Sequence, residues 1–71
     1  MNKKSIHNKL ENLRDVLQED LDDREFYYDS RSDAWQESEK GDDYLERSDM
    51  LEETIGNLQM AIDSFEEFLG I

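Results

Sequence analysis

The chain has 71 residues, twenty acidic against eight basic side chains, a net charge of −12 and no cysteine. The missing thiols exclude a disulfide framework, a thiolate zinc site and a cysteine nucleophile, and they fit a reducing cytosol. A domain this small buries a modest share of its surface, so without disulfides it needs a metal, regular helix packing or a second copy. With no proline and few glycines, the composition predicts a single all-α domain over residues 1–71.

The N-terminal sequence MNKKSIHNKLE is basic, and neither an apolar h-region nor a membrane-spanning run follows it. We therefore expect a cytoplasmic protein, with residues 1–4 disordered. Residues 1–14 hold four basic side chains and one acidic one, whereas residues 15–71 hold four basic and nineteen acidic ones. An acidic body repels phosphate backbones and anionic lipid, which argues against direct binding of nucleic acid or membrane and favours a basic partner. The alternative is that the charge only keeps the protein soluble.

The first half of the chain follows a helical period. Its apolar stripe consists of Ile6, Leu10, Leu13, Leu17, Leu21, Tyr28 and Trp35. Ser5 can cap its start, and Gly41 after Lys40 is typical of the left-handed residue that ends a helix. These features predict a helix over about residues 5–39.

The second half carries a heptad seam, in which apolar positions alternate by threes and fours. These positions are Tyr44, Ser48, Leu51, Ile55, Leu58, Ile62, Phe65 and Leu69, with Ser48 as the one interruption. Asp43 and Glu46 have the spacing of a capping box, and Gly70 has the position of a C-terminal cap. The pattern predicts a helix over about residues 43–69, and hence an antiparallel helical hairpin that turns near Gly41.

In such a hairpin the numbers of facing residues add up to about 82, with the first helix longer than the second. Leu17 then faces Phe65, and Trp35 faces Ser48 and lies beside Tyr44. The small Ser48 leaves room for the large Trp35, so Trp35 and Gly41 are interpreted as structural, not catalytic. The N-terminal turns overhang the hairpin in this register.

Several apolar side chains lie off the seam, and two helices cannot bury so wide a stripe. We expect a second copy to cover this surface, which would make a homodimeric four-helix bundle; the alternative is a different protein. The residues assigned to this partner or dimer interface are Ile6, Leu10, Phe26, Tyr27, Met50, Met60 and Phe68.

Carboxylates also form rows along both helices. The predicted acidic surface consists of Asp15, Glu19, Asp22, Asp29, Asp33 and Glu37 on the first helix, with Asp49, Glu52, Glu53 and Asp63 on the second. Helical neighbours lie about 6 Å apart, which is similar to the phosphate spacing of a duplex. The rod could therefore act as a DNA mimic that occupies the groove of a nucleic-acid-binding protein, although ordinary acidic coiled coils share the pattern.

The sequence holds no strong catalytic or metal-binding pattern. The acidic cluster EDLDDRE, residues 19–25, lacks the glycine and ligand order of a calcium loop, so a solvated acidic face is favoured over a cation site. His7, the single histidine, is interpreted as exposed and without a partner acid. We expect no enzyme activity, no cofactor and no metal.

The most distinctive stretch is WQESEKG, residues 35–41, with Tyr28, Arg31 and Ser32 before it and Tyr44 after it. This pattern resembles the shared core, similar to YxxRSxxWQESEKGxxY, of a group of small acidic helical proteins encoded by tailed bacteriophages. The resemblance covers about residues 26–69 and leaves the first 25 residues uncovered. It implies a phage accessory protein in the host-cell cytoplasm, and the group has no assigned reaction.

The leading hypothesis is therefore a non-enzymatic accessory protein that binds a basic host or phage protein and so modulates it. Its acidic faces would steer the approach, and exposed aromatic or methionine side chains would supply close contact. The alternative remains a DNA-mimic inhibitor.

Overall fold

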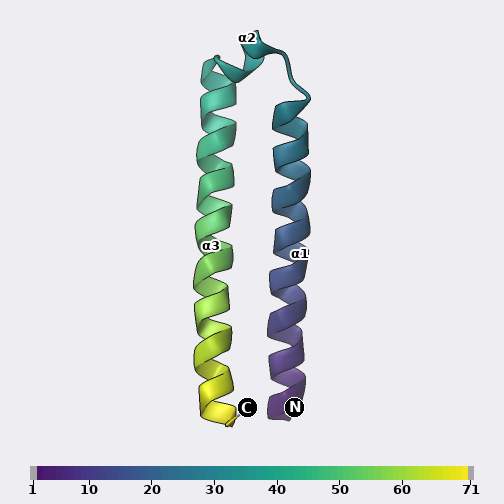
Figure 1. Cartoon of the computed structure of the whole chain (residues 1–71), viewed down its shortest axis with the longest axis vertical. Coiled ribbons are helices and arrows are strands. Elements are labelled where there is room, and N and C mark those ends of the chain that lie inside the picture. The colour runs from purple at the N-terminus through teal and green to yellow at the C-terminus, as the bar shows by residue number, and fades with distance from the viewer. Residues whose placement is uncertain (1, 71) are drawn as a thin grey trace.

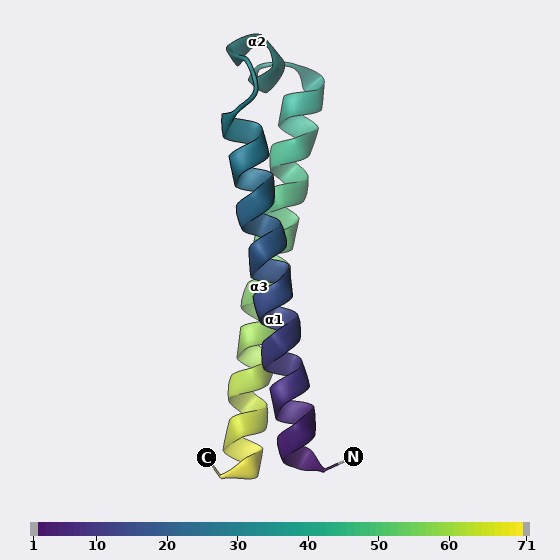
Figure 2. The same cartoon turned by 90° about the vertical axis from the view of Figure 1, so that its right-hand side faces the viewer.

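The computed structural model describes residues 2–70, which form two long helices joined by a short one. Helix α1 is Lys3–Asp29, α2 is Asp33–Gln36 and α3 is Glu39–Leu69. Figures 1 and 2 show α1 and α3 side by side in opposite directions, with α2 across the closed end and both chain ends at the open end. The rod measures 50 × 17 × 15 Å. The predicted all-α antiparallel helical hairpin is confirmed. Within residues 2–70, no helix combines the length and apolar character that crossing a bilayer requires.

Helix α1 begins earlier than the sequence predicts. Asn2 is its N-cap, and the Asn2 side chain accepts a hydrogen bond of 2.7 Å from the backbone N–H of Ser5. Asn is a strong N-cap residue because its side-chain oxygen satisfies a backbone donor that the first turn leaves free. The predicted disorder of residues 1–4 is therefore wrong for residues 2–4, and Met1 lies outside the described residues.

Helix α1 ends at Asp29, well before the predicted end at residue 39. The Ser30 hydroxyl donates to backbone carbonyls of the last turn. Ser32 then takes an extended conformation and caps α2, accepting a hydrogen bond of 3.3 Å from the N–H of Trp35. Serine side chains compete for backbone groups in this way and so favour helix ends over helix interiors. The prediction of one helix over residues 5–39 is wrong because these serines interrupt it.

Gly41 lies in the first turn of α3 and does not end the first helix. Ser38 caps α3, accepting a hydrogen bond of 3.3 Å from the Gly41 N–H. A Cβ atom on Gly41 would overlap the backbone carbonyls of Trp35 and Gln36. Glycine is required because α2 passes close to α3, and the predicted left-handed turn at this residue is wrong.

Helix α3 starts at Glu39, ahead of the predicted residue 43, and ends at Leu69 as predicted. Gly70 follows in a left-handed conformation with φ of 81°, and its N–H donates to the carbonyls of Glu66 and Glu67. Glycine adopts this conformation without the steric cost of a Cβ atom, so the role predicted for Gly70 is confirmed.

Contacts between α1 and α3 set a register that differs from the predicted one. The Lys3 ammonium lies 4.8 Å from the centroid of the Phe68 ring, and Arg14 Nη1 donates to Gln59 Oε1 at 2.8 Å. The numbers of facing residues therefore add up to about 72 and not to about 82. The predicted pairing and overhang are wrong because the chain reverses over residues 30–38, ahead of Gly41.

The core between the two helices is small. In the described part of the chain, the buried side chains larger than glycine are the hydrophobic Leu21 and Ile62 and the polar His7 and Ser48. Of the other apolar residues predicted in the stripe and the seam, Ile6 and Leu13 are exposed. The rest are only half-buried, and they are Leu10, Leu17, Tyr28, Trp35, Tyr44, Leu51, Ile55, Leu58, Phe65 and Leu69. The hairpin therefore leaves much of its apolar surface in contact with solvent.

Candidate functional site

Four aromatic rings pack together at the closed end. The Trp35 ring lies 5.7 Å from the Tyr44 ring and 5.9 Å from each of the Tyr27 and Tyr28 rings, measured between centroids. Arg31 lies over the Tyr27 and Trp35 rings, at 5.4 and 5.2 Å. Edge-to-face ring pairs and arginine over rings each add modest stability beyond burial. The predicted neighbourhood of Trp35 and Tyr44 is confirmed, but Trp35 reaches it from α2 and not from the first helix.

Hydrogen bonds within the closed end account for much of the remaining WQESEKG pattern. Gln36 Nε2 donates to the Tyr28 carbonyl at 2.9 Å and to the Arg31 carbonyl at 3.3 Å. The Ser38 hydroxyl donates to the Trp35 carbonyl as well as capping α3. Each of these side chains satisfies a backbone group where the chain leaves a helix. The distinctive motif therefore builds the turn, which agrees with its interpretation as structural.

Arg24 links the two helices below the closed end. Its Nε donates to Ser48 Oγ and its Nη2 to the Tyr44 carbonyl, both at 3.0 Å, and its guanidinium lies 4.0 Å from the centroid of the Tyr44 ring. Ser48 does not leave space for Trp35; it is buried and accepts this hydrogen bond.

Arg24→Met is expected to lower the free energy of unfolding by about 1–3 kcal/mol, because it leaves the buried Ser48 hydroxyl without its donor. The matched control is Arg47→Met, which removes an exposed ion pair with Asp43 at 3.1 Å and should change stability by at most about 1 kcal/mol. Urea titrations followed by circular dichroism measure both. Equal losses in the two variants would contradict the structural role of Arg24.

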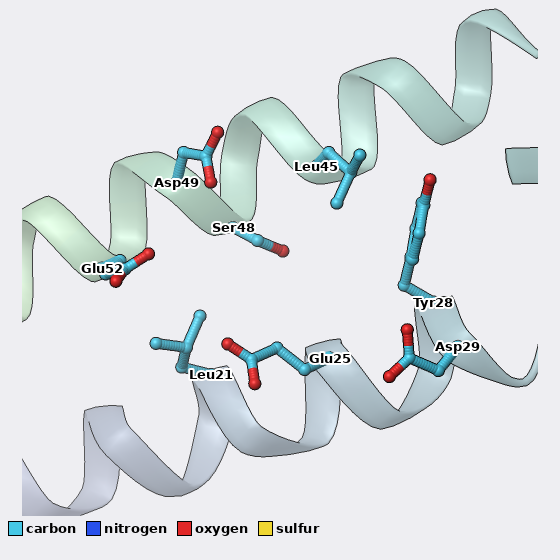
Figure 3. Close-up of a pocket in the computed structure, with 8 residues that line it drawn as sticks. All are labelled: Leu21, Glu25, Tyr28, Asp29, Leu45, Ser48, Asp49 and Glu52. Carbon is cyan, nitrogen blue, oxygen red and sulfur yellow. The ribbon is translucent and has the colours of Figure 1, made fainter. Parts of the chain in front are cut away.

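A groove lies between α1 and α3 on one face of the hairpin, near the closed end, with a volume of about 270 Å³. We call it the acidic groove. Its lining, drawn in Figure 3, consists of Leu21, Glu25, Tyr28 and Asp29 from α1 and Leu45, Ser48, Asp49 and Glu52 from α3. Leu21, Tyr28 and Leu45 make it partly apolar, and two carboxylates from each helix surround them. The groove thus combines an apolar surface with a negative rim.

No basic side chain within residues 2–70 forms an ion pair with those four carboxylates. The arginines are engaged elsewhere: Arg14 pairs with Asp15 at 3.0 Å and Arg47 with Asp43 at 3.1 Å, whereas Arg24 and Arg31 lie over aromatic rings. Carboxylates that lack a cation on their own chain raise the negative potential of a concave surface and attract basic groups.

The residues of the predicted acidic surface are all exposed. The acidic groove brings together Asp29, Asp49 and Glu52, whereas the other predicted acids lie outside it. The sequence pattern does not place Glu25 on this surface, whereas the observed register puts it beside the groove and across from Ser48. Asp33 lies in α2 and Glu37 in the connection after it, so their predicted place on the first helix is wrong.

The residues of the predicted interface do not gather at one place. Phe26 and Tyr27 lie near the closed end, where Tyr27 joins the aromatic cluster, whereas Phe68 lies at the open end against Lys3. The others are Met50 and Met60, which are exposed, Ile6, which is at the border of exposure, and Leu10, which is half-buried. Leu13 and Val16 are also exposed, at 56% and 59%. The predicted place of Leu13 in the seam is wrong. Buried His7 marks a seam position and the next equivalent position, seven residues on, is Arg14, so Leu13 lies one residue before the seam.

His7 is buried at the open end, so its interpretation as exposed is wrong. Its Nδ1 lies 3.3 Å from Glu11 Oε1, and its Nε2 lies 3.3 Å from Glu66 Oε2 without hydrogen-bond geometry. The spacing of four residues between His7 and Glu11 predicts the first contact, whereas the second requires the register. Between residues 2 and 70, no group of three or more His, Cys, Asp or Glu side chains is arranged to hold a metal ion.

A comparison of the chain with known protein families, characterised proteins and solved structures finds no match. Of the features described here, the acidic groove carries the clearest chemical preference, which is for a basic side chain.

Proposed function

We propose that this chain is a non-enzymatic, phage-type accessory protein that works in the host cytoplasm by binding a basic surface of a host or phage protein. The observation that carries this proposal is the acidic groove, with its four carboxylates and its partly apolar lining. An arginine or lysine of the partner can lay its aliphatic stem on Leu45 and the Tyr28 ring while its charged head meets the carboxylates.

The charge of the whole rod supports the same proposal. A net charge of −12 on a rod 50 Å long attracts a basic partner from a distance and speeds encounter, whereas the groove fixes where the partner docks. Salt screens such attraction over about 8 Å at physiological ionic strength, so binding should weaken as salt rises.

The resemblance of residues 28–44 to a phage protein core suggests where such a partner would be found. In this chain that core builds the closed end, through Trp35, Gln36 and Gly41. The closed end sets the register of the two helices, and the register creates the acidic groove. We propose that this pattern serves to hold that register and that the partner is a protein of the bacterial cell or of the phage.

The test is capture of partners from bacterial lysate on the immobilised chain, followed by calorimetric titration of the main captured protein. Glu25→Gln with Glu52→Gln is expected to weaken its binding about tenfold, because two ion pairs are lost. The matched control is Glu46→Gln with Glu67→Gln, which removes the same charge from exposed positions outside the groove. Equal weakening by the two double variants, or capture of no protein at low salt, would refute the groove as the binding site.

The second candidate is the DNA mimic, which is favoured by the exposed carboxylates spread along the full rod. A duplex 50 Å long carries about 29 phosphates, since it has one negative charge per 1.7 Å. The single chain carries a net of −12 over this length, less than half as much, so we rank mimicry below groove binding. Mimicry requires that the captured protein binds DNA and that excess duplex displaces it from this chain; a complex that survives excess duplex rules it out.

A further inference from the structure

The hairpin exposes more surface than a compact protein of its mass. Its accessible surface is 5494 Å², whereas a folded monomer of 8.5 kDa exposes roughly 4,650 Å². The difference, roughly 800 Å², is about what one partner buries in a protein interface of standard size. The small core of the hairpin leads to the same conclusion, because a domain of this length without disulfides is marginal alone.

The exposed apolar side chains that could fill such an interface lie on the face opposite the acidic groove. Leu13 comes just before a seam position of α1, and Ala61 and Phe68 come just before the seam residues Ile62 and Leu69 of α3. In an antiparallel helix pair, positions that precede the seam on both helices lie on the same face. The groove residues Glu25 and Glu52 each lie four residues after a buried seam residue, Leu21 and Ser48. Positions with this spacing lie on the other face of the helix pair.

Other contacts agree with this placement. The Lys3 ammonium reaches the Phe68 ring across the helix pair, and the Phe65 and Phe68 rings stack with centroids 5.9 Å apart. Leu13 and Val16 line a shallow hollow of about 240 Å³ on α1. We call Leu13, Val16, Ala61 and Phe68 the apolar face.

A row along α1 shows which partner suits this face. Lys9, Val16 and Asp23 are exposed and spaced seven residues apart, so they form one row along the helix. The row consists of a cation, an apolar side chain and an anion, in that order. Val16 is also the midpoint of Lys3–Asp29. A second copy turned end for end about Val16 brings Lys9 of each chain against Asp23 of the other, with valine on valine. A parallel copy brings like charges together, which is unfavourable.

We propose that a second copy of this chain covers the apolar face, antiparallel and related by a two-fold axis that crosses the rod near Val16. The pair forms a four-helix bundle in which the basic N-terminal turns of each chain lie over the acidic half of the other. The acidic grooves face outward on both sides, so dimer formation does not depend on the proposed function of the groove.

Sedimentation equilibrium over a range of concentrations tests the dimer. The wild-type chain is expected to dimerise with a dissociation constant in the micromolar range or tighter. Leu13→Glu with Val16→Glu is expected to weaken the dimer at least about 100-fold, because two exposed apolar side chains become charged at its centre. The matched control Phe26→Glu changes the most exposed phenylalanine, at 77%, away from this face and should leave the dimer intact. A wild-type chain that stays monomeric, or a dimer that survives the double change, overturns the proposal.

Charge reversal tests the orientation of the two copies. It changes only exposed charged residues, so it also tests the dimer if the glutamate variant loses its helical circular dichroism. Lys9→Asp and Asp23→Lys alone should each weaken the dimer about 2- to 20-fold, and the two together should restore wild-type affinity. Lys9 and Asp23 lie 14 residues apart on one helix, which is too far for contact within a chain. Single reversals without effect, or a double variant that stays weak, overturn the antiparallel arrangement, and the groove variant Glu25→Gln with Glu52→Gln should remain dimeric.

Discussion

Gly41→Ala is expected to lower the free energy of unfolding by about 3 kcal/mol. The added Cβ atom would overlap the backbone carbonyls of Trp35 and Gln36, and neither backbone group can rotate away as a side chain could. The closed end would have to move off α3, which separates the aromatic rings. Urea titration at fixed protein concentration, followed by circular dichroism and by Trp35 fluorescence, measures the loss.

Gly56→Ala is the matched control for this change. Gly56 also lies inside α3, but a Cβ atom there would meet nothing within 4 Å. Alanine has the higher helix propensity, so the control should raise stability by about 0.5–1 kcal/mol. The opposite signs separate the close approach of α2 from the general effect of alanine in a helix. Stabilisation by both substitutions would show that α2 does not press on Gly41.

Ile62→Ala is expected to lower the free energy of unfolding by about 2–5 kcal/mol, and in a domain of this size such a loss leaves little folded protein. Ile62 is the most deeply buried large side chain in the described part of the chain, at 1% exposure. Removing its outer carbons leaves a cavity in the seam, toward the open end, that neighbouring side chains fill only partly. The measurement is thermal unfolding followed by circular dichroism at several concentrations.

Met60→Ala provides the comparison for Ile62→Ala. Met60 is exposed and lies two residues away on the same helix, so its loss should change stability by no more than about 0.5 kcal/mol. A loss similar to that of Ile62→Ala would show that Met60 is covered, either by the second copy or by a different packing of the hairpin. That outcome would move the dimer interface away from Leu13 and Val16.

The helical hairpin was predictable because its seams repeat over many turns, and the heptad from Tyr44 to Leu69 alone specifies most of α3. The turn was not, because two local signals compete. Gly41 after Lys40 suggests the end of a helix, whereas Ser32 and Ser38 are equally good helix starts. The structure uses the serines, and Gly41 instead serves a contact between α2 and α3 that no local pattern shows.

The candidate sites follow from the register more than from the residue types. Single acids such as Asp49 and Glu52 were predicted as exposed, and they are. Their meeting with Glu25 across a groove could not be predicted, since a shift of about ten positions separates the expected pairing from the observed one. The same shift hid the contact of His7 with Glu66.

The position of the one tryptophan has a practical consequence. Trp35 contacts three tyrosines at the closed end and lies far from His7 at the other pole of the rod. Its emission therefore reports on that pole alone, whereas circular dichroism averages over both long helices. The chain thus carries its own local probe. The difference between the melting temperatures from Trp35 fluorescence and from circular dichroism shows at which pole the helices first come apart.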